Sequence, residues 1–244
     1  GLITVVKTPS KASIVEINSE TDFVAKNPEF NSFCEQVSNL CLESDSLESL
    51  KEKKTDKNLT VSETLVNLIA KIGENIQIRR FKNIDYKSQV STYIHNKENN
   101  NSGKLAVLLS YTSDTQDLCK DFANQLCMHI AAMSPQSQDE RGISQEFLDN
   151  EKKIMKDQLL EEGKKPEMIE KIILGKVSKI IKDNTLLGQK WVINSELTVQ
   201  QAIDGFVKDA KSSFSIENFV RYKVGEGIEI KKSDFADEVK DLTN

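Results

Sequence analysis

The sequence predicts an α+β fold, with two lobes of small antiparallel sheets packed against helices and an inserted antiparallel helical hairpin, or coiled coil. Short stretches rich in β-branched residues indicate strands. Apolar residues that recur at intervals of three and four indicate amphipathic helices. Two long, charged helical patterns, separated by Gly163 and Pro166, indicate the hairpin. Together these three observations predict a mixed α+β chain.

The composition is typical of a folded globular protein. Apolar residues make up 38% and charged residues 29% of the 244 residues, unlike the composition of a disordered chain. The longest apolar runs, such as residues 105–109, are about five residues long, whereas a membrane-spanning helix needs roughly 20. The 38 Asp and Glu residues outnumber the 33 Lys and Arg residues, so non-specific binding to nucleic acid is not expected.

The first lobe, over residues 1–135, begins with two β-branched stretches that predict paired strands joined by a turn at Pro9. Asn27 is typical of a helix N-cap, and Pro28 suits the first helical position. Residues 60–63, Thr-Val-Ser-Glu, predict a capping box at the start of a second helix. Each of these helices carries its apolar side chains on one face.

Three more strands are expected near residues 76–78, 90–94 and 105–109, and their succession suggests an antiparallel sheet. A long helix follows and ends at Pro135. Its apolar face is formed by Leu118, Phe122, Leu126, Ile130 and Met133.

Four segments are expected after the first lobe. Residues 136–143 form a linker, residues 144–184 the helical hairpin, residues 185–230 the second lobe, and residues 231–244 a short amphipathic helix. The apolar residues of that last helix are spaced by four and three: Phe235, Val239 and Leu242.

The residue counts limit the chemistry. With two histidines, His95 and His129, a histidine-rich metal site is excluded. The four cysteines show no C-x-x-C spacing and lie in apolar helical patterns, which predicts buried free thiols and suits a reducing compartment. The sequence has no G-x-x-x-x-G-K-[ST] motif, and residues 225–227 are too short for a phosphate loop. We therefore expect no cofactor, no metal and no nucleotide bound by this chain alone.

The turn between a predicted strand and the helix capped by Asn27 is unusual, because the apolar Phe23 and Val24 directly follow acidic residues. In one interpretation, Phe23 folds back onto the helix and Asp22 caps it in a Ser19-x-x-Asp22 box. In the other, Phe23 is an exposed aromatic anchor beside a charge, a pairing typical of protein interfaces.

A hydrolase that uses Glu20 and Asp22 as paired carboxylates is a further alternative. The two acids lie two residues apart in a loop, and the sequence offers no second acid or base motif. Acid pairs in loops are common, so this alternative is disfavoured.

Residues 14–26, Ile-Val-Glu-Ile-Asn-Ser-Glu-Thr-Asp-Phe-Val-Ala-Lys, resemble the signature of the translation elongation factor Ts family, whose hallmark is T-D-F-V after a strand ending V/I-E-x-N. Four further segments are similar to blocks of that family in the same order. These are residues 69–76, residues 128–132 with Pro135, Gly188-Gln189 followed by Thr198-Val199, and residues 219–228.

The resemblance implies a guanine nucleotide exchange factor that binds elongation factor Tu in its GDP-bound and nucleotide-free forms, speeds GDP release and catalyses no covalent chemistry. In the family, the T-D-F-V turn enters the GTPase near its nucleotide and magnesium site. The turn corresponds here to Thr21, Asp22, Phe23 and Val24. The resemblance implies that Phe23 wedges between partner side chains, while Asp22 helps to disturb magnesium and phosphate binding.

The resemblance also implies that His129 lies at the partner surface and that the last helix docks on the partner through Phe235, Val239 and Leu242. Without the resemblance, His129 is interpreted as an ordinary helix-edge histidine, and the last helix as one that packs on its own core. A thousandfold faster GDP release needs about 4 kcal/mol, whereas burial of one Phe side chain yields roughly 1.5–3 kcal/mol. A broad contact surface is therefore expected.

Other implications concern assembly and compartment. Members of the family usually begin with a small three-helix domain that contacts the GTPase; this sequence starts just after that point, so weaker binding is expected. The hairpin corresponds to a coiled-coil insert that forms a dimer in some members, and a homodimer is left open here. The family occurs in bacterial cytoplasm, mitochondria and plastids, so secretion is not expected. The alternative function is a helical scaffold or interaction protein without exchange activity.

Overall fold

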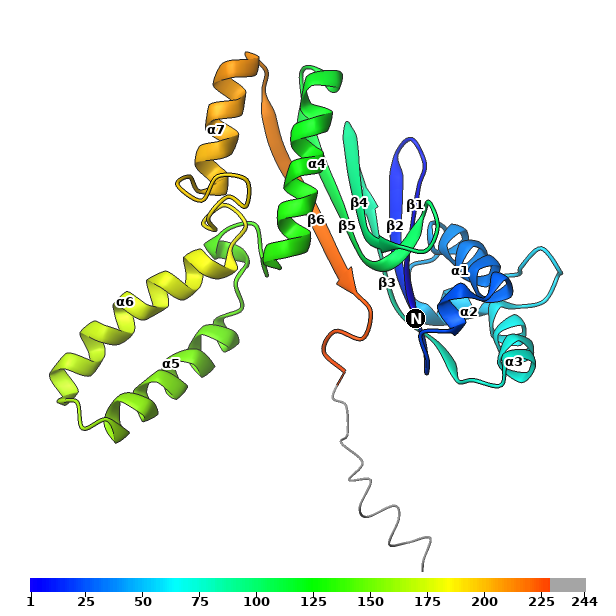
Figure 1. The fold of residues 1–244 in the computed structure, drawn as a ribbon, viewed down its shortest axis with the longest axis horizontal. Helices are drawn as coiled ribbons and strands as arrows, with labels where there is room; N and C mark the ends of the chain where they lie inside the picture. The colour runs from blue at the N-terminus through cyan, green and yellow to red at the C-terminus, as the bar shows by residue number, and fades with distance from the viewer. Residues whose placement is uncertain (229–244) are drawn as a thin grey trace, which may run out of the picture.

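A computed structural model describes residues 1–228, with the backbone but not the side chains of Gln116 and Asp117. Within this range six strands form one antiparallel sheet (Figure 1). The strands are β1 (Leu2–Lys7), β2 (Lys11–Ser19), β3 (Ile76–Asp85), β4 (Gln89–Lys97), β5 (Ser102–Ser113) and β6 (Phe214–Lys223). The helices are α1 (Pro28–Cys41), α2 (Leu47–Glu52), α3 (Val61–Ile72), α4 (Gln116–Met133), α5 (Gln145–Glu161), α6 (Pro166–Asn184) and α7 (Val199–Ala210), with short 3-10 helices η1 (Val24–Lys26) and η2 (Glu140–Gly142). The predicted α+β class is confirmed.

The sheet has the order β3-β2-β1-β5-β4, and β6 also pairs with β5. Gly103 of β5 pairs with both Lys97 of β4 and Ile3 of β1, so β1 lies on the edge of β5 opposite β4. Two residue pairs, Ile3 with Gly103 and Thr4 with Ser102, make up this junction. The strands of the two expected lobes thus belong to one sheet, whose halves β1-β2-β3 and β4-β5-β6 meet at a short junction.

The expected sheet of three consecutive strands differs from the structure. β3 pairs with β2, from Ser19 opposite Ile76 to Lys11 opposite Asp85, and lies at the other end of the sheet from β4. The free edge of β2 in the β1–β2 hairpin matches almost the full length of β3, so this pairing satisfies the backbone hydrogen-bonding groups along both strands.

The first helices begin where the sequence predicts. The side chain of Asn27 accepts a hydrogen bond from the backbone N–H of Glu29 at 2.8 Å, and Pro28 is the first residue of α1. Thr60 and Glu63 form the predicted reciprocal capping box of α3. Helices α1, α2 and α3 cover the β1-β2-β3 half of the sheet (Figure 1).

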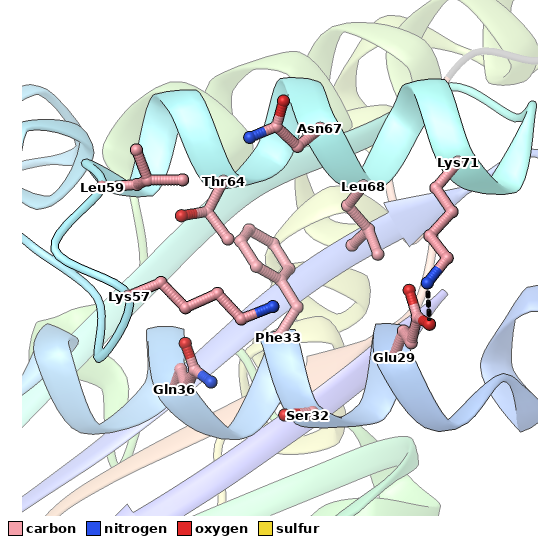
Figure 2. A pocket seen from close by; sticks show the side chains of 10 residues that line it. All are labelled: Glu29, Ser32, Phe33, Gln36, Lys57, Leu59, Thr64, Asn67, Leu68 and Lys71. Carbon is pink, nitrogen blue, oxygen red and sulfur yellow. Dashed lines mark hydrogen bonds and ion pairs between the residues drawn. The ribbon is translucent and has the colours of Figure 1, made fainter.

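A cavity of about 170 Å³ lies between α1 and α3 (Figure 2). Phe33 and Leu68 give it an apolar floor, and an ion pair between Glu29 of α1 and Lys71 of α3 spans one end of it. Leu59 also lines it, and the other side chains around it are polar or charged. The cavity thus lies between two helices that already share a core.

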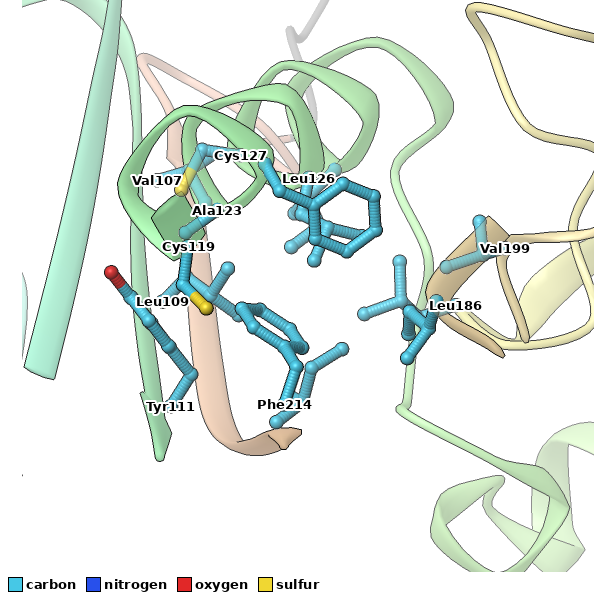
Figure 3. Packing of buried hydrophobic residues seen from close by; sticks show 14 of the residues in the cluster. Val107, Leu109, Tyr111, Cys119, Ala123, Leu126, Cys127, Leu186, Val199 and Phe214 are labelled. Atoms are coloured by element: carbon cyan, nitrogen blue, oxygen red, sulfur yellow. The ribbon is translucent and has the colours of Figure 1, made fainter. Parts of the chain in front are cut away.

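The largest core packs α4 and α7 against β5 and β6 (Figure 3). It joins residues of the expected first lobe, such as Leu109 and Leu126, with Leu186, Val199 and Phe214 from the later part of the chain. Packing therefore crosses residue 135, and the boundaries of the expected domains stay predictions. A third core contains residues from both halves of the sheet, including Ile14 and Ile84 from one half and Ile94 and Leu108 from the other.

A buried carboxylate ties the two halves together. Glu16 of β2 has no exposed surface, and its oxygens accept hydrogen bonds from Nη1 of Arg79 at 2.9 Å and from Nε of Arg80 at 2.6 Å. The backbone N–H of Gly225, just after β6, donates to Oε1 of Glu16 at 2.8 Å. The Arg80 guanidinium also lies 4.1 Å from the ring centre of Tyr222 in β6. These contacts connect β2, β3 and the turn after β6.

Helices α5 and α6 form an antiparallel pair that extends away from the sheet (Figure 1). Gly163 adopts a positive φ of 73° in the connection, and Pro166 is the first residue of α6, as predicted. Met155, Leu159 and Ile169 are buried between the two helices. The description of this hairpin as a coiled coil stays a prediction. Among the described helices, none combines the length and apolar character needed to cross a membrane.

Candidate functional site

The turn at residues 21–24 connects β2 with η1 and α1. Val24 and Ala25 are buried in the core beneath α1, whereas Phe23 is 85% exposed, more than any other large apolar side chain among residues 1–228. Phe23 therefore does not fold back onto the helix. Asp22 does not cap the helix either, because Asn27 occupies the N-cap. Of the two interpretations of this turn, the one with an exposed aromatic beside a charge describes the structure.

A single carboxylate holds the first residue of the turn. Oε2 of Glu74 accepts a hydrogen bond from the backbone N–H of Thr21 at 2.9 Å, and Oε1 accepts one from the Thr21 hydroxyl at 2.6 Å. Glu74 follows Gly73, which ends α3 with a φ of 80° and so turns the chain toward β3. The hydroxyl of Ser19 adds a third bond, donated to the carbonyl oxygen of Thr21 at 2.9 Å.

The acidic residue of the turn is paired within the chain. Nζ of Lys104, at the start of β5, lies 2.6 Å from Oδ1 of Asp22 and also donates to the carbonyl oxygen of Gly1 at 3.0 Å. The hydrogen bond from Lys104 and its positive charge lower the pKa of Asp22, so the carboxylate is ionised at neutral pH. The side chain of Asp22 nevertheless remains 88% exposed. A partner can therefore reach both Asp22 and Phe23.

His129 does not lie at the surface of the described chain, so the helix-edge interpretation is wrong, and its expected contact with a partner stays a prediction. It follows Leu126 by three residues and Phe122 by seven, so it shares their buried face of α4. The backbone N–H of Val192 donates to Nδ1 of His129 at 3.2 Å. Nε2 therefore carries the proton of the neutral ring and donates to Oε1 of Gln189 at 3.0 Å.

The His129 network fixes the segment that follows the hairpin. Nε2 of Gln189 donates to the carbonyl oxygens of Met133 and Asp183 at 3.1 and 2.8 Å, so α4 and α6 are linked at their C-terminal ends. The ring of Trp191 stacks on His129 with centres 5.2 Å apart. Burial lowers the pKa of His129, and the hydrogen bond with Gln189 opposes this shift without cancelling it. His129 has the contacts of a structural residue.

Phe235, Val239 and Leu242, the expected contacts of the last helix, lie outside the described residues. Two residues of the site were missed by the sequence analysis. Glu74 stands within the motif at residues 69–76, but nothing in the pattern assigns it a role. Lys104 is 82 residues from Asp22, and their pairing depends on the β1–β5 junction.

The described part of the chain offers little for covalent or metal chemistry. Residues 1–228 hold no group of three or more His, Cys, Asp or Glu side chains arranged to bind a metal ion. The four cysteines are buried and unbonded, and burial raises the pKa of the Cys41 and Cys127 thiols to about 12. What the fold displays is an exposed aromatic beside an ionised acid in an anchored turn, an arrangement typical of a protein interface.

Comparison with known proteins identifies the family. A family model described as Elongation factor TS matches residues 20–226. A protein of Nitratiruptor sp. named Elongation factor Ts is 44% identical over 235 residues, which cover 93% of this chain and 75% of the relative. Relatives of the same name from Clostridium kluyveri and Rickettsia bellii are 40% and 37% identical; they cover 94% and 93% of this chain, and the matches span 75% and 74% of the relatives. The chain belongs to the elongation factor Ts family.

Proposed function

We propose that this chain promotes GDP release from elongation factor Tu by inserting the Asp22–Phe23 turn near the nucleotide and magnesium site. As a member of its family the chain is a translation elongation factor that acts in nucleotide exchange on elongation factor Tu and catalyses no covalent reaction. The proposal adds which part of the chain performs the exchange and how it does so.

The observation that carries the proposal is the exposure of Phe23 in a turn that is fixed on both sides. Val24 and Ala25 anchor the turn in the core, and Glu74 holds Thr21. A residue whose backbone is already held loses little backbone freedom when it enters a pocket, so more of the free energy of burying its side chain favours the complex. This makes Phe23 a suitable wedge.

A wedge weakens GDP binding by moving the groups that hold the nucleotide. The magnesium ion neutralises the phosphates, so displacement of its supporting groups lowers the affinity for GDP strongly. Burial of one Phe supplies roughly 1.5–3 kcal/mol, less than the ~4 kcal/mol that a thousandfold acceleration needs. The rest must come from other contacts between the two proteins.

In this mechanism, Lys104 reduces the repulsion between Asp22 and the phosphates of the nucleotide. A lone carboxylate brought near phosphates would be repelled, whereas the Asp22–Lys104 ion pair approaches with almost no net charge. The pair also leaves the Asp22 side chain exposed, so its carboxylate remains available to groups of the partner.

The experiment is the release of a fluorescent GDP analogue from elongation factor Tu with and without the chain. A rate that rises with the concentration of the chain supports exchange activity. An unchanged rate, together with binding, would favour the alternative of a scaffold or interaction protein.

The compartment expected from the sequence stays a prediction.

We also propose a homodimer that forms through the α5–α6 hairpin. Ile154, Leu160, Met168 and Leu174 of these helices are each about half exposed or more, with Leu174 at 73%. Contact between two hairpins would remove these apolar side chains from water. Sedimentation equilibrium tests this: a monomer at all concentrations would contradict it, and Leu174→Lys should weaken any dimer.

A further inference from the structure

Glu74 lies where the ladder between β2 and β3 would continue. The last pair of that ladder is Ser19 opposite Ile76. One more step along each antiparallel strand would place residue 20 opposite residue 75, and the next would place Thr21 opposite Glu74. At this step the Glu74 side chain, not its backbone, accepts the hydrogen bond of the Thr21 N–H.

Because a side-chain acceptor takes the place of a backbone acceptor, strand β2 ends here and the N–H of Thr21 still has a hydrogen-bond partner. A backbone acceptor would extend β2 and carry residues 22 and 23 along the sheet. The carboxylate reaches forward instead, accepts both donors of Thr21, and lets the chain turn into η1. Hydrogen bonds to an ionised acceptor are about twice as strong as neutral ones, so this contact is well suited to fix an exposed residue.

Glu74 is itself held in a rigid corner. On one side the N–H of Gly73 donates to the carbonyl oxygen of Ile69 at 2.8 Å and closes α3. On the other side Ile76 is buried and begins β3. The Glu74 carboxylate is therefore attached to a fixed backbone, and its hydrogen bonds restrict the position of Thr21 in the turn.

Only Asp22 and Phe23 lie between the residue that Glu74 holds and the buried Val24. We propose that Glu74 is a positioning residue for nucleotide exchange: its two-point contact with Thr21 holds the Asp22–Phe23 tip in the orientation that docks on the GTPase. The inference rests on the proposed role of this tip. Loss of the contact leaves Phe23 in place but lets it sample other orientations, so fewer encounters place it correctly.

Glu74→Gln is the first test, because the amide keeps the size of the side chain but is uncharged and has only one acceptor, Oε1, so it cannot accept both donors of Thr21 as the carboxylate does. Thr21→Val removes the hydroxyl donor without altering the α3–β3 corner. Glu29→Gln is the matched control, since Glu29 is a nearby acid that pairs with Lys71 and makes no hydrogen bond to the turn. All three variants are compared with the intact chain for GDP release from elongation factor Tu, for melting temperature, and for hydrogen exchange at the Thr21 amide.

We expect Glu74→Gln to speed hydrogen exchange at the Thr21 amide and to reduce the second-order rate of stimulated GDP release by roughly tenfold, with little change in melting temperature. Thr21→Val should slow GDP release in the same direction. The double variant should be hardly worse than Glu74→Gln, because both changes break one contact. Glu29→Gln should release GDP at nearly the rate of the intact chain.

Several results would overturn the inference. The first is an unchanged rate of hydrogen exchange at the Thr21 amide in Glu74→Gln. The second is a normal rate of GDP release in that variant despite faster hydrogen exchange. The third is an equal loss of GDP-release rate in Glu29→Gln. A loss in Glu74→Gln with normal release in Thr21→Val would indicate that Glu74 contacts the partner directly. If Glu74→Gln does not fold, Thr21→Val decides alone. Phe23→Ala separates the two ideas: if it slows release while Glu74→Gln does not, the proposed function stands and the positioning role fails.

Discussion

Nζ of Lys104 lies 2.6 Å from Oδ1 of Asp22, across 82 residues of chain. The acid of the candidate exchange turn is thus paired before any partner approaches. Because the Asp22 side chain is 88% exposed, the pair adds little to stability. We expect the ion pair to matter instead because it sets the net charge that the turn brings to a nucleotide site.

Lys104→Gln should therefore slow stimulated GDP release, since it leaves Asp22 unpaired beside the phosphates. An exposed pair is worth up to about 1 kcal/mol, so we expect a loss of up to about fivefold. The loss should shrink as salt is raised, because salt screens exposed charges. The measurement is the GDP-release rate at two ionic strengths.

Two further variants separate charge from shape at this position. Lys104→Arg retains the charge and should release GDP at close to the normal rate. Asp22→Asn with Lys104→Gln makes the tip neutral and should recover part of the loss. Equal losses in Lys104→Arg and Lys104→Gln would refute a role for the charge.

His129 predicts a pH dependence of stability. Its pKa is lowered in the folded protein, so below the ordinary value near 6.5 the unfolded chain binds more protons than the folded one. Stability from the neutral ring is fully present above that value and falls as the pH drops below it. His129→Asn should lower the melting temperature at pH 7.5 and reduce the further loss on acidification to pH 5.5.

The comparison must be with His95→Asn, because other groups titrate in the same range. Their contribution is common to both variants. Identical pH profiles for the His129 and His95 variants would show that His129 is not the buried neutral group.

Glu16 should be among the least replaceable residues of the fold. Glu16→Gln leaves Arg79 and Arg80 without their anionic partner next to a buried amide, which we expect to cost about 2–4 kcal/mol of unfolding free energy. Urea unfolding measures this, with the exposed Glu98→Gln as the control. A cost within 1 kcal/mol would mean that the buried Glu16 carboxylate does not tie the two halves of the sheet.

Local signals predicted local structure well. Asn27 with Pro28, and Thr60 with Glu63, mark helix starts because a cap needs only residues within one turn. The Phe23 turn was recognised for a similar reason, since an aromatic between a strand and a cap has no evident core to enter. The family motif then favoured the interface interpretation.

Long-range contacts explain what the sequence analysis missed. β3 pairs with β2 and not with β4, because strand order depends on which edges are free after folding. His129 is buried by a segment about sixty residues later, although its spacing from Leu126 and Phe122 already placed it on the apolar face of α4. Lys104 and Glu74 reach the turn only through the sheet, so no pattern within the turn indicates them.

The most direct test of the central claim is GDP release from elongation factor Tu stimulated by Phe23→Ala, with Val66→Ala as a control at another exposed apolar residue, on α3. Loss of the ring, which the proposal buries in the complex, should cost about 1.5–3 kcal/mol, so the stimulated rate should fall roughly tenfold to over a hundredfold. Val66→Ala should be near normal, and both melting temperatures should be almost unchanged. Normal GDP release by a folded Phe23→Ala protein would contradict the role of the turn as a wedge.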